Sequence, residues 1–223
     1  MSKQQKCGSC RHSGISAYDG LLVCMIDQKT RPVVDKNKEA CDDCEPRGIK
    51  INRVWSMPSI WTFGMKVVAK LFSYYSVGNG WVDPFAGENS PAEHRNDIEG
   101  RGNPSQLDAL EFLETLQDNS FNGVLFDPPY SVEQCLRRYT PKHNGTAGRA
   151  EYWAKCKDEI ARILKSGGHC ISFCWDSVGI GANRGFRIEE ILIICHGACH
   201  NDTIVTVDRK IGSGEKHNQG RLF

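Results

Sequence analysis

The stretch that most constrains this chain is residues 124–130, which read VLFDPPY. Three large apolar residues run directly into Asp127 and two prolines, which predicts a buried parallel strand that ends in a rigid turn. In open α/β sheets, ligands bind at the carboxyl ends of the strands. The stretch therefore predicts an α/β fold with a ligand site at this turn.

The residue types in the turn suit one kind of chemistry. An exocyclic amine of a nucleobase is a poor nucleophile, because its lone pair is delocalised into the ring. The Asp127 carboxylate and a backbone carbonyl of the Pro128–Pro129 segment can each accept one amine hydrogen, and proline fixes the direction of these carbonyls. Tyr130 offers a flat face on which an extruded base can stack. The alternative interpretation is a proline-rich turn with Tyr130 packed in the core.

A second strand-to-turn pattern precedes this one, at residues 80–87 (GWVDPFAG). A short apolar strand enters an Asp-Pro-Phe turn, and Gly87 allows the backbone to approach a ligand closely.

The two turns, in this order, resemble motifs IV and I of the amino-methyltransferases, which methylate exocyclic amines of adenine or cytosine with S-adenosylmethionine. The resemblance implies a Rossmann-like class I methyltransferase sheet, mostly parallel with an antiparallel last strand. It also implies S-adenosylmethionine as the cofactor. It assigns the catalytic turn to Asp127, Pro128, Pro129 and Tyr130, and the contacts to the methionine part of the cofactor to Asp83, Pro84, Phe85 and Gly87.

Three more residues match positions of this family. Phe63 lies in a Thr-Phe pair that resembles motif X and precedes a helix, for which Thr62 is the expected cap and whose apolar face is Met65, Val68, Leu71 and Phe72. The resemblance implies that Phe63 contacts the cofactor, Asp97 its ribose hydroxyls and Asp108 its adenine amine. Each residue also has a structural interpretation. In it, Phe63 is a core residue, Asp97 is a surface acid, and Asp108 caps a helix over residues 105–113.

The chain departs from the family pattern after Gly87. Asn89 occupies the position of the second glycine of motif I. A parallel crossover ordinarily needs a dozen or more residues, yet residues 92–98 already read as the next strand, and Pro91 interrupts any helix before it. The first crossover helix is therefore expected to be missing. This shortened form resembles adenine-specific methylases of phages and prophages, over most of residues 50–211.

The remaining pattern predicts the other elements. Residues 46–60 read as a connector, and residues 152–164 as a helix that stops at Gly167-Gly168. Strands are expected at 170–175, at 186–195 after a short helical start, and at 203–207, with the last two forming an antiparallel hairpin. Residues 195–200 (CHGACH) fit the hairpin connection better than a metal site, because their spacing matches no zinc or haem signature.

Cysteines organise the first 48 residues. Their spacing is Cys7-x2-Cys10, then Cys24, then Cys41-x2-Cys44, in a polar segment that cannot build its own core. Thiolates at such spacing are typical of structural zinc. Resemblance to small four-cysteine modules implies Cys7, Cys10, Cys24 and Cys41 as ligands, and the symmetrical alternative replaces Cys24 by Cys44. Free thiols or an iron–sulfur cluster remain open.

Length and charge indicate the domain organisation and a possible partner of the chain. Its 223 residues suit one α/β domain and a small module, so we expect a zinc-binding module at 1–48, a methyltransferase domain at 49–211 and a flexible tail at 212–223. The net charge is +1, but the loop 131–150 is basic and could meet phosphates; the alternative is a solvated flexible loop. Its candidate nucleic-acid contacts are Arg137, Arg138, Lys142 and Arg149.

The cysteine count and the absence of an apolar leader suggest a compartment. Eleven cysteines, an odd number, lie partly in apparent core strands, which argues against a disulfide scaffold and for a reducing cytoplasm. No run is long and apolar enough to span a bilayer, so no membrane partner is expected.

The sequence thus predicts a DNA adenine (N6) methyltransferase that flips its target base onto the Asp127–Tyr130 turn. Two alternatives stay open: an RNA or cytosine amino-methyltransferase, and a catalytically inactive methyltransferase fold that binds nucleic acid. A redox protein that uses the cysteines is a weaker alternative.

Overall fold

The structure is a computed structural model. It describes residues 49–59, 61–131, 133–135, 150–197 and 200–212, together with the backbone of 13–15 and 22–24. The chain separates into two compact units, Met1–Ile49 and Lys50–Phe223. In the first, β1 (Ser13–Ile15) pairs antiparallel with β2 (Leu22–Cys24). Several predictions concern side chains outside the described residues: the thiols of Cys7, Cys10, Cys24, Cys41 and Cys44, the basic side chains of Arg137, Arg138, Lys142 and Arg149, and the tail from residue 213 onward.

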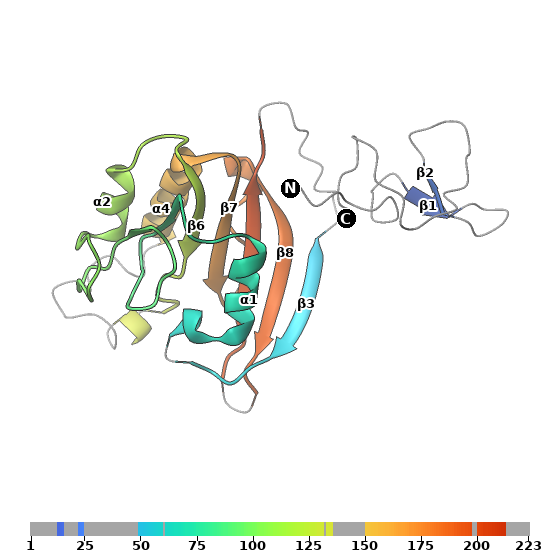
Figure 1. Cartoon of the computed structure of the whole chain (residues 1–223), viewed down its shortest axis with the longest axis horizontal. Helices are drawn as coiled ribbons and strands as arrows, with labels where there is room; N and C mark the ends of the chain where they lie inside the picture. Colours follow the sequence, from blue (N-terminus) through green and yellow to red (C-terminus); the bar gives the residue numbers. More distant parts are fainter. Residues whose placement is uncertain are drawn as a thin grey trace. The chain divides into compact units, whose positions relative to one another are not determined.

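The second unit is built on a seven-stranded mixed sheet, shown in Figure 1. Its strand order is β3-β8-β9-β7-β6-β4-β5, and every neighbouring pair is parallel except the two pairs that involve β9. The prediction of a mostly parallel sheet with an antiparallel last strand is confirmed. The strands are β3 (Lys50–Trp55), β4 (Trp81–Asp83), β5 (His94–Arg95), β6 (Phe121–Phe126), β7 (Leu164–Cys174), β8 (Phe186–Cys195) and β9 (Thr203–Lys210).

Helices cover both faces of this sheet. Helix α1 (Lys66–Tyr74) packs on one face through Val68, Leu71 and Phe72, and Met65 just before it is buried as well, as the helical spacing predicts (Figure 1). Helices α2 (Ala109–Glu114) and α4 (Ala150–Ile163) pack on the other face. Strand β6 is buried from both sides, and its continuous apolar run reflects this position in the middle of the sheet.

Several boundaries differ from expectation. Helix α4 ends at Ile163 and β7 begins at Leu164, so the two glycines lie inside a strand rather than after a helix. Gly167 has a φ of +81°, and the pairing of β7 with β6 shifts register between Phe121 and Gly123. The glycines therefore permit an irregular strand start. Residues 186–195 are all strand, and their antiparallel hairpin with β9 is confirmed.

The interpretation of residues 46–60 as a connector is wrong for Lys50–Trp55, which form β3 at the edge of the sheet, next to β8. The local pattern hides this strand because one of its faces is apolar yet exposed, at Ile51 and Trp55. The other face carries Asn52, whose amide donates to Oε1 of Glu190 over 2.7 Å, and Val54, which packs against the core.

The connection from β4 to β5 contains no helix. Residues 84–93 form turns and irregular segments, and β5 has two residues, His94 and Arg95. The prediction that the first crossover helix is missing is confirmed. A parallel neighbour is nevertheless reached, with Val82 beside His94 and Asp83 beside Arg95.

Candidate functional site

The turn after β4 is organised by Asp83, the last residue of that strand. The Asp83 side chain is fully buried; its Oδ1 accepts from the amide of Phe85 over 2.9 Å, and its Oδ2 from Ser90 Oγ over 2.6 Å. Burial raises the pKa of Asp83 to about 7, the two hydrogen bonds offset part of that rise, and the charges of Asp127 and Asp97 add to it. The buried Asp83 carboxylate thus holds Phe85 and Ser90 of the loop after β4 through hydrogen bonds.

Asn96 connects the loops around the β4–β5 connection, which contains no helix. Its side chain is fully buried and donates to the carbonyls of Pro84 (3.2 Å) and Leu107 (3.0 Å). Its Oδ1 accepts from the amide of Leu107 over 2.9 Å. Its backbone amide donates to the Asp83 carbonyl over 2.9 Å. One amide side chain therefore ties the turn after β4 to the segment that leads into α2.

Asp97 lies just beyond β5 and is almost fully buried. Its Oδ2 accepts from the amide of Gly87 over 3.1 Å and forms an ion pair with Nη1 of Arg101 at 3.3 Å. Gly87 has a φ of +54°, and a Cβ there would lie 3.1 Å from Cζ3 of Trp61. Asp97 therefore holds Gly87 in a conformation and a space that favour glycine.

Asp108 caps helix α2, as its position predicts. Its Oδ1 accepts from the amide of Leu110 over 2.9 Å. The same oxygen accepts from the hydroxyl of Tyr152 on α4 over 2.8 Å. The expectation that Thr62 caps α1 is wrong: Thr62 begins a separate 3-10 helix, η2 (Thr62–Gly64), and the residue before α1 is Met65, whose side chain makes no capping hydrogen bond.

The turn after β6 is closed by its own side chains. The hydroxyl of Tyr130 donates to Oδ1 of Asp127 over 2.6 Å, and the amide of Tyr130 donates to Oε1 of Gln134 over 2.7 Å. The Tyr130 hydroxyl also makes a hydrogen bond with the side chain of Thr62. Burial, and then the charge of Asp127, hold the pKa of Tyr130 well above its ordinary value, so the phenol keeps its proton.

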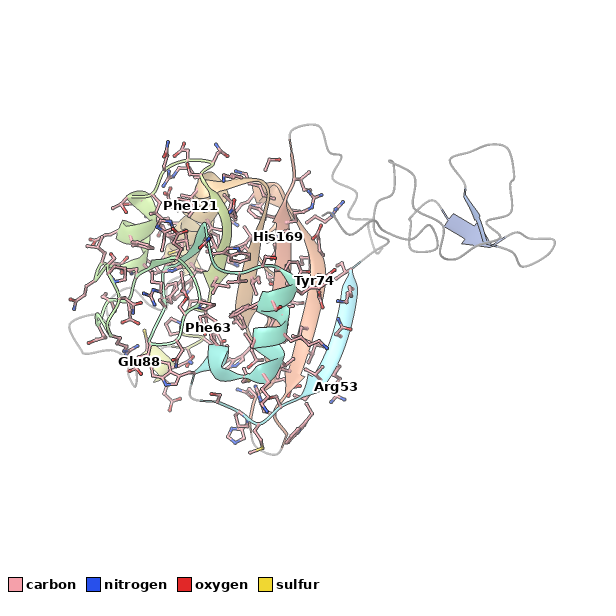
Figure 2. All side chains as sticks on the ribbon, viewed as in Figure 1. Arg53, Phe63, Tyr74, Glu88, Phe121 and His169 are labelled. Atoms are coloured by element: carbon pink, nitrogen blue, oxygen red, sulfur yellow. The ribbon has the colours of Figure 1, made fainter. Side chains whose placement is uncertain are left out.

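Two pockets meet at this turn. The first pocket brings together Phe63, Phe85, Gly87, Asp127, Pro128 and Pro129 from the predicted site, with Trp61, Thr62, Ala86, Asn89, Arg101 and Gln134. Phe63, labelled in Figure 2, also packs against Phe72 and Phe173, with ring centroids 5.2 and 5.5 Å away. Phe63 is therefore a core residue that also lines the first pocket, and its contact with a cofactor stays a prediction. Asp83, Pro84, Asp97 and Asp108 do not line this pocket.

The second pocket contains Tyr130 and shares Thr62 and Gln134 with the first. Its other lining residues are Pro58, Ser59, Met65, Trp175, His196, His200, Asn201 and Thr203. They come from the segment before α1, the end of β7 and the β8–β9 connection.

His196 is a structural member of the second pocket. Its Nδ1 lies 2.9 Å from the carbonyl oxygen of Ser56, just after β3, and its Nε2 lies 3.0 Å from Oγ1 of Thr203 at the start of β9. A carbonyl can only accept, so Nδ1 donates and, in the neutral ring, Nε2 accepts. The imidazole joins two strand ends, which agrees with the hairpin interpretation of residues 195–200.

Sequence reasoning misses several lining residues, of which Trp175, Gln134 and Thr62 matter most. Trp175 follows a buried strand and is 47% exposed. A tryptophan at the carboxyl end of a predicted parallel strand is a signal that could have identified it. Gln134 and Thr62 carry no comparable signal, because their contacts depend on how the turn closes.

Comparisons with known proteins give distant structural likenesses. No protein-family model matches the chain, and no curated protein matches it significantly. Solved structures that resemble it include a Burkholderia thailandensis 1,6-didemethyltoxoflavin-N1-methyltransferase, bound to 1,6-didemethyltoxoflavin and S-adenosylhomocysteine (TM-score 0.44, 11% identity, covering 65% of this chain and 76% of that one).

Two Thermus thermophilus proteins are also similar. One is TrmN (TM-score 0.42, 14% identity, covering 66% of this chain and 49% of that one). The other is TTHA0409, a proposed DNA modification methylase (TM-score 0.34, 19% identity, covering 49% of this chain and 55% of that one). The matched regions span about half the length of these two proteins. With TM-scores below 0.5, these likenesses do not assign the chain to a family.

Two kinds of feature are absent from the described residues. No group of three or more histidine, cysteine, aspartate or glutamate side chains is placed to hold a metal ion in the described part of the chain. Among those same residues, no helix is both long and apolar enough to cross a membrane.

Proposed function

We propose that this chain is an S-adenosylmethionine-dependent methyltransferase that acts on the exocyclic amine of adenine in DNA. The observation that carries the proposal is the position of the Asp127–Tyr130 turn between two pockets at the carboxyl end of β6. Asp127, Pro128 and Pro129 line the first pocket, and Tyr130 lines the second. A cofactor in one pocket and an acceptor in the other would meet at this turn.

The first pocket suits the cofactor. Aromatic residues Trp61, Phe63 and Phe85 line it together with the Asp127 carboxylate, and Gly87 lets the Trp61 ring pack close to its backbone. Bound there, S-adenosylmethionine would supply an electrophilic methyl group on a sulfonium.

The predicted cofactor residues outside the pocket support its walls. Asp97 and Asn96 hold the loop that forms one wall, and Asp108 fixes the start of α2. In this proposal Asp83, Pro84, Asp97 and Asp108 act on the cofactor through loop geometry.

The catalytic turn orients the acceptor. The Asp127 carboxylate and a Pro128 or Pro129 carbonyl accept the two amine hydrogens, which leaves the nitrogen lone pair directed at the first pocket. The new nitrogen–carbon bond forms as the carbon–sulfur bond breaks, and the surplus amine proton passes to Asp127 or to solvent. The chain contributes positioning and the exclusion of water, which are large terms in methyl transfer between bound reactants.

The remaining parts of the proposal rest on sequence alone. A zinc-bound module in residues 1–48 would serve folding or DNA contact, and the basic side chains Arg137, Arg138, Lys142 and Arg149 would contact DNA phosphates.

Transfer of a labelled methyl group to unmethylated genomic DNA tests the function. We expect label in N6-methyladenine with the wild type, and a loss of roughly a hundredfold or more with Asp127→Ala. Affinity for S-adenosylmethionine, measured by calorimetry, should stay within a few-fold in that variant. Glu114→Ala removes an exposed acid on α2 and serves as the matched control.

The outcomes separate the alternatives. Full turnover in Asp127→Ala would overturn the proposed role of the turn. Label in RNA or in cytosine would instead favour the other amino-methyltransferases. Cofactor and DNA binding without any transfer would identify an inactive nucleic-acid-binding fold.

A further inference from the structure

The Tyr130 ring is engaged on two sides by the protein. Its hydroxyl lies between Oδ1 of Asp127, at 2.6 Å, and the side chain of Thr62. The ring packs against the core on the α1 face of the sheet, which contains Met65 and Phe173. A tyrosine held at its tip and along its ring has little freedom to adapt to an incoming base, but it fixes the carboxylate that it binds.

A second aromatic ring, that of Trp175, lies beside Tyr130 and is exposed to solvent. Trp175 is 47% exposed, lines the second pocket, and stands edge-on to Tyr130 with ring centroids 5.6 Å apart. It directly follows β7, whose Ser172 pairs with Phe126, the residue before Asp127. The indole is therefore open to solvent and close to the catalytic turn.

From these positions we propose a division of roles that rests on the proposed function: Tyr130 is a positioning residue that orients Asp127 through its hydroxyl, and Trp175 is the surface on which the acceptor base stacks. An edge-on neighbour does not cover both faces of the indole, and a large exposed aromatic face is what an extruded base binds. A charge-assisted hydrogen bond to the carboxylate restrains its plane at the moment when it must accept an amine hydrogen.

The alternative assignment, in which Tyr130 stacks the base, makes different predictions. A stacking tyrosine tolerates phenylalanine, because the ring remains. A positioning tyrosine does not, because the hydroxyl is what acts. The pair Tyr130→Phe and Trp175→Ala therefore discriminates between the two assignments.

The test measures kcat and KM for methyl transfer to unmethylated genomic DNA at saturating S-adenosylmethionine. Tyr130→Phe should lower kcat about ten-fold with KM for DNA unchanged, in line with the loss of one hydrogen bond to a charged group. Trp175→Ala should raise KM for DNA about ten-fold with kcat little changed, in line with the loss of base stacking, and Trp175→Phe should restore most of the affinity.

Two matched controls isolate these effects. Tyr75→Phe removes another tyrosine–carboxylate hydrogen bond, the 3.1 Å contact with Glu190, away from both pockets. Trp55→Ala removes another exposed tryptophan, on β3, that lines neither pocket. Both should keep wild-type kcat and KM, and thermal unfolding of every variant checks that it is folded.

The inference and the proposed function fail in distinguishable ways. If the wild type transfers no methyl group to DNA, RNA or free nucleosides, the proposed function is wrong. If the wild type is active but Tyr130→Phe keeps full kcat, or Trp175→Ala keeps the wild-type KM, the division of roles is overturned while the function stands.

Discussion

Asp83 is a titratable residue whose burial opposes its charge. The carboxyl has no contact with solvent, and its pKa is raised from 3.8 to about 7 by that burial. In the unfolded chain the group ionises near its ordinary pKa, so between about pH 4 and pH 7 the folded state binds more protons than the unfolded state. Stability linked to Asp83 is therefore greatest at low pH and falls as the pH rises toward 7.

This linkage gives the first prediction. Raising the pH from 4 to 8 should cost up to roughly 4 kcal/mol through Asp83, and Asp83→Asn should remove most of that dependence. An amide can keep both contacts, since its oxygen accepts from Phe85 and its nitrogen donates to Ser90. Urea unfolding at several pH values measures the effect, with the exposed Glu114→Gln as a control. Identical pH slopes for the wild type and Asp83→Asn would contradict it.

Gly87 gives the second prediction, because another glycine provides a matched reference. Gly87 and Gly102 both have positive φ, +54° and +75°, but only a Cβ at Gly87 would meet a neighbour, the ring of Trp61. Gly102→Ala should cost about 1 kcal/mol from backbone strain alone. Gly87→Ala should cost roughly 2–3 kcal/mol, because the ring must also move.

The same two variants test the first pocket as a cofactor site. Calorimetry with S-adenosylmethionine should show weaker binding for Gly87→Ala, since Gly87 and Trp61 both line that pocket, and unchanged binding for Gly102→Ala. Equal effects of the two substitutions on stability and affinity would mean that the Trp61 contact is unimportant.

Single residues also mark how far sequence reasoning reaches. The Asp127–Tyr130 turn can be predicted at the end of a buried strand because its residues are contiguous. The bond between Tyr130 and Asp127 cannot, because it depends on Gln134 holding the Tyr130 amide and on Thr62 from a distant segment. Trp175 is likewise predicted only as part of a strand. Contacts between distant segments leave little trace in local sequence.

At the scale of elements, the β4–β5 connection shows how two parallel strands are joined without a crossover helix. Pro91 and the short spacing predict that no helix fits between these strands. Pro91 and the spacing do not show that the Asn96 side chain holds this connection by hydrogen bonds to Pro84 and Leu107. Strand β3 escapes prediction for a related reason: its exposed Ile51 and Trp55 hide the alternation that identifies edge strands.

Asn96→Ala is the prediction that belongs to this element. The substitution strips buried hydrogen-bond partners from two carbonyls and one amide, so it should lower the free energy of unfolding by roughly 2–4 kcal/mol. Asn96→Asp keeps only the acceptor for the Leu107 amide and should rescue little. Asn122→Ala, on an exposed side chain of β6, is the control and should cost much less. A loss for Asn96→Ala no larger than for Asn122→Ala would show that the connection does not depend on this side chain.

At the scale of the whole molecule, the two compact units pose different stability problems. The second has two apolar cores, one on each face of its sheet. The described strands of the first unit are three residues each, and a two-stranded pair of that length is at best marginally stable in water. From the cysteine spacing alone, we propose that a zinc ion organises residues 1–48.

Metal analysis of the full-length protein tests that proposal. We expect stoichiometric zinc without iron, and loss of the metal in Cys7→Ser and Cys10→Ser. Cys24→Ser and Cys44→Ser distinguish the two proposed ligand sets, because only one of the two should lose zinc. Iron instead of zinc would favour a cluster, and a metal-free protein would rule out the module as proposed.

The place of β9 has a consequence for how the chain is made. This strand joins β8 to β7, yet it follows both of them along the sequence. Until residues 203–210 have left the ribosome, the sheet is two separate halves, each with an open edge of unpaired backbone groups. Such edges are templates for association with other chains. During synthesis β7 and β8 therefore each keep one unpaired edge until β9 becomes available to pair with both.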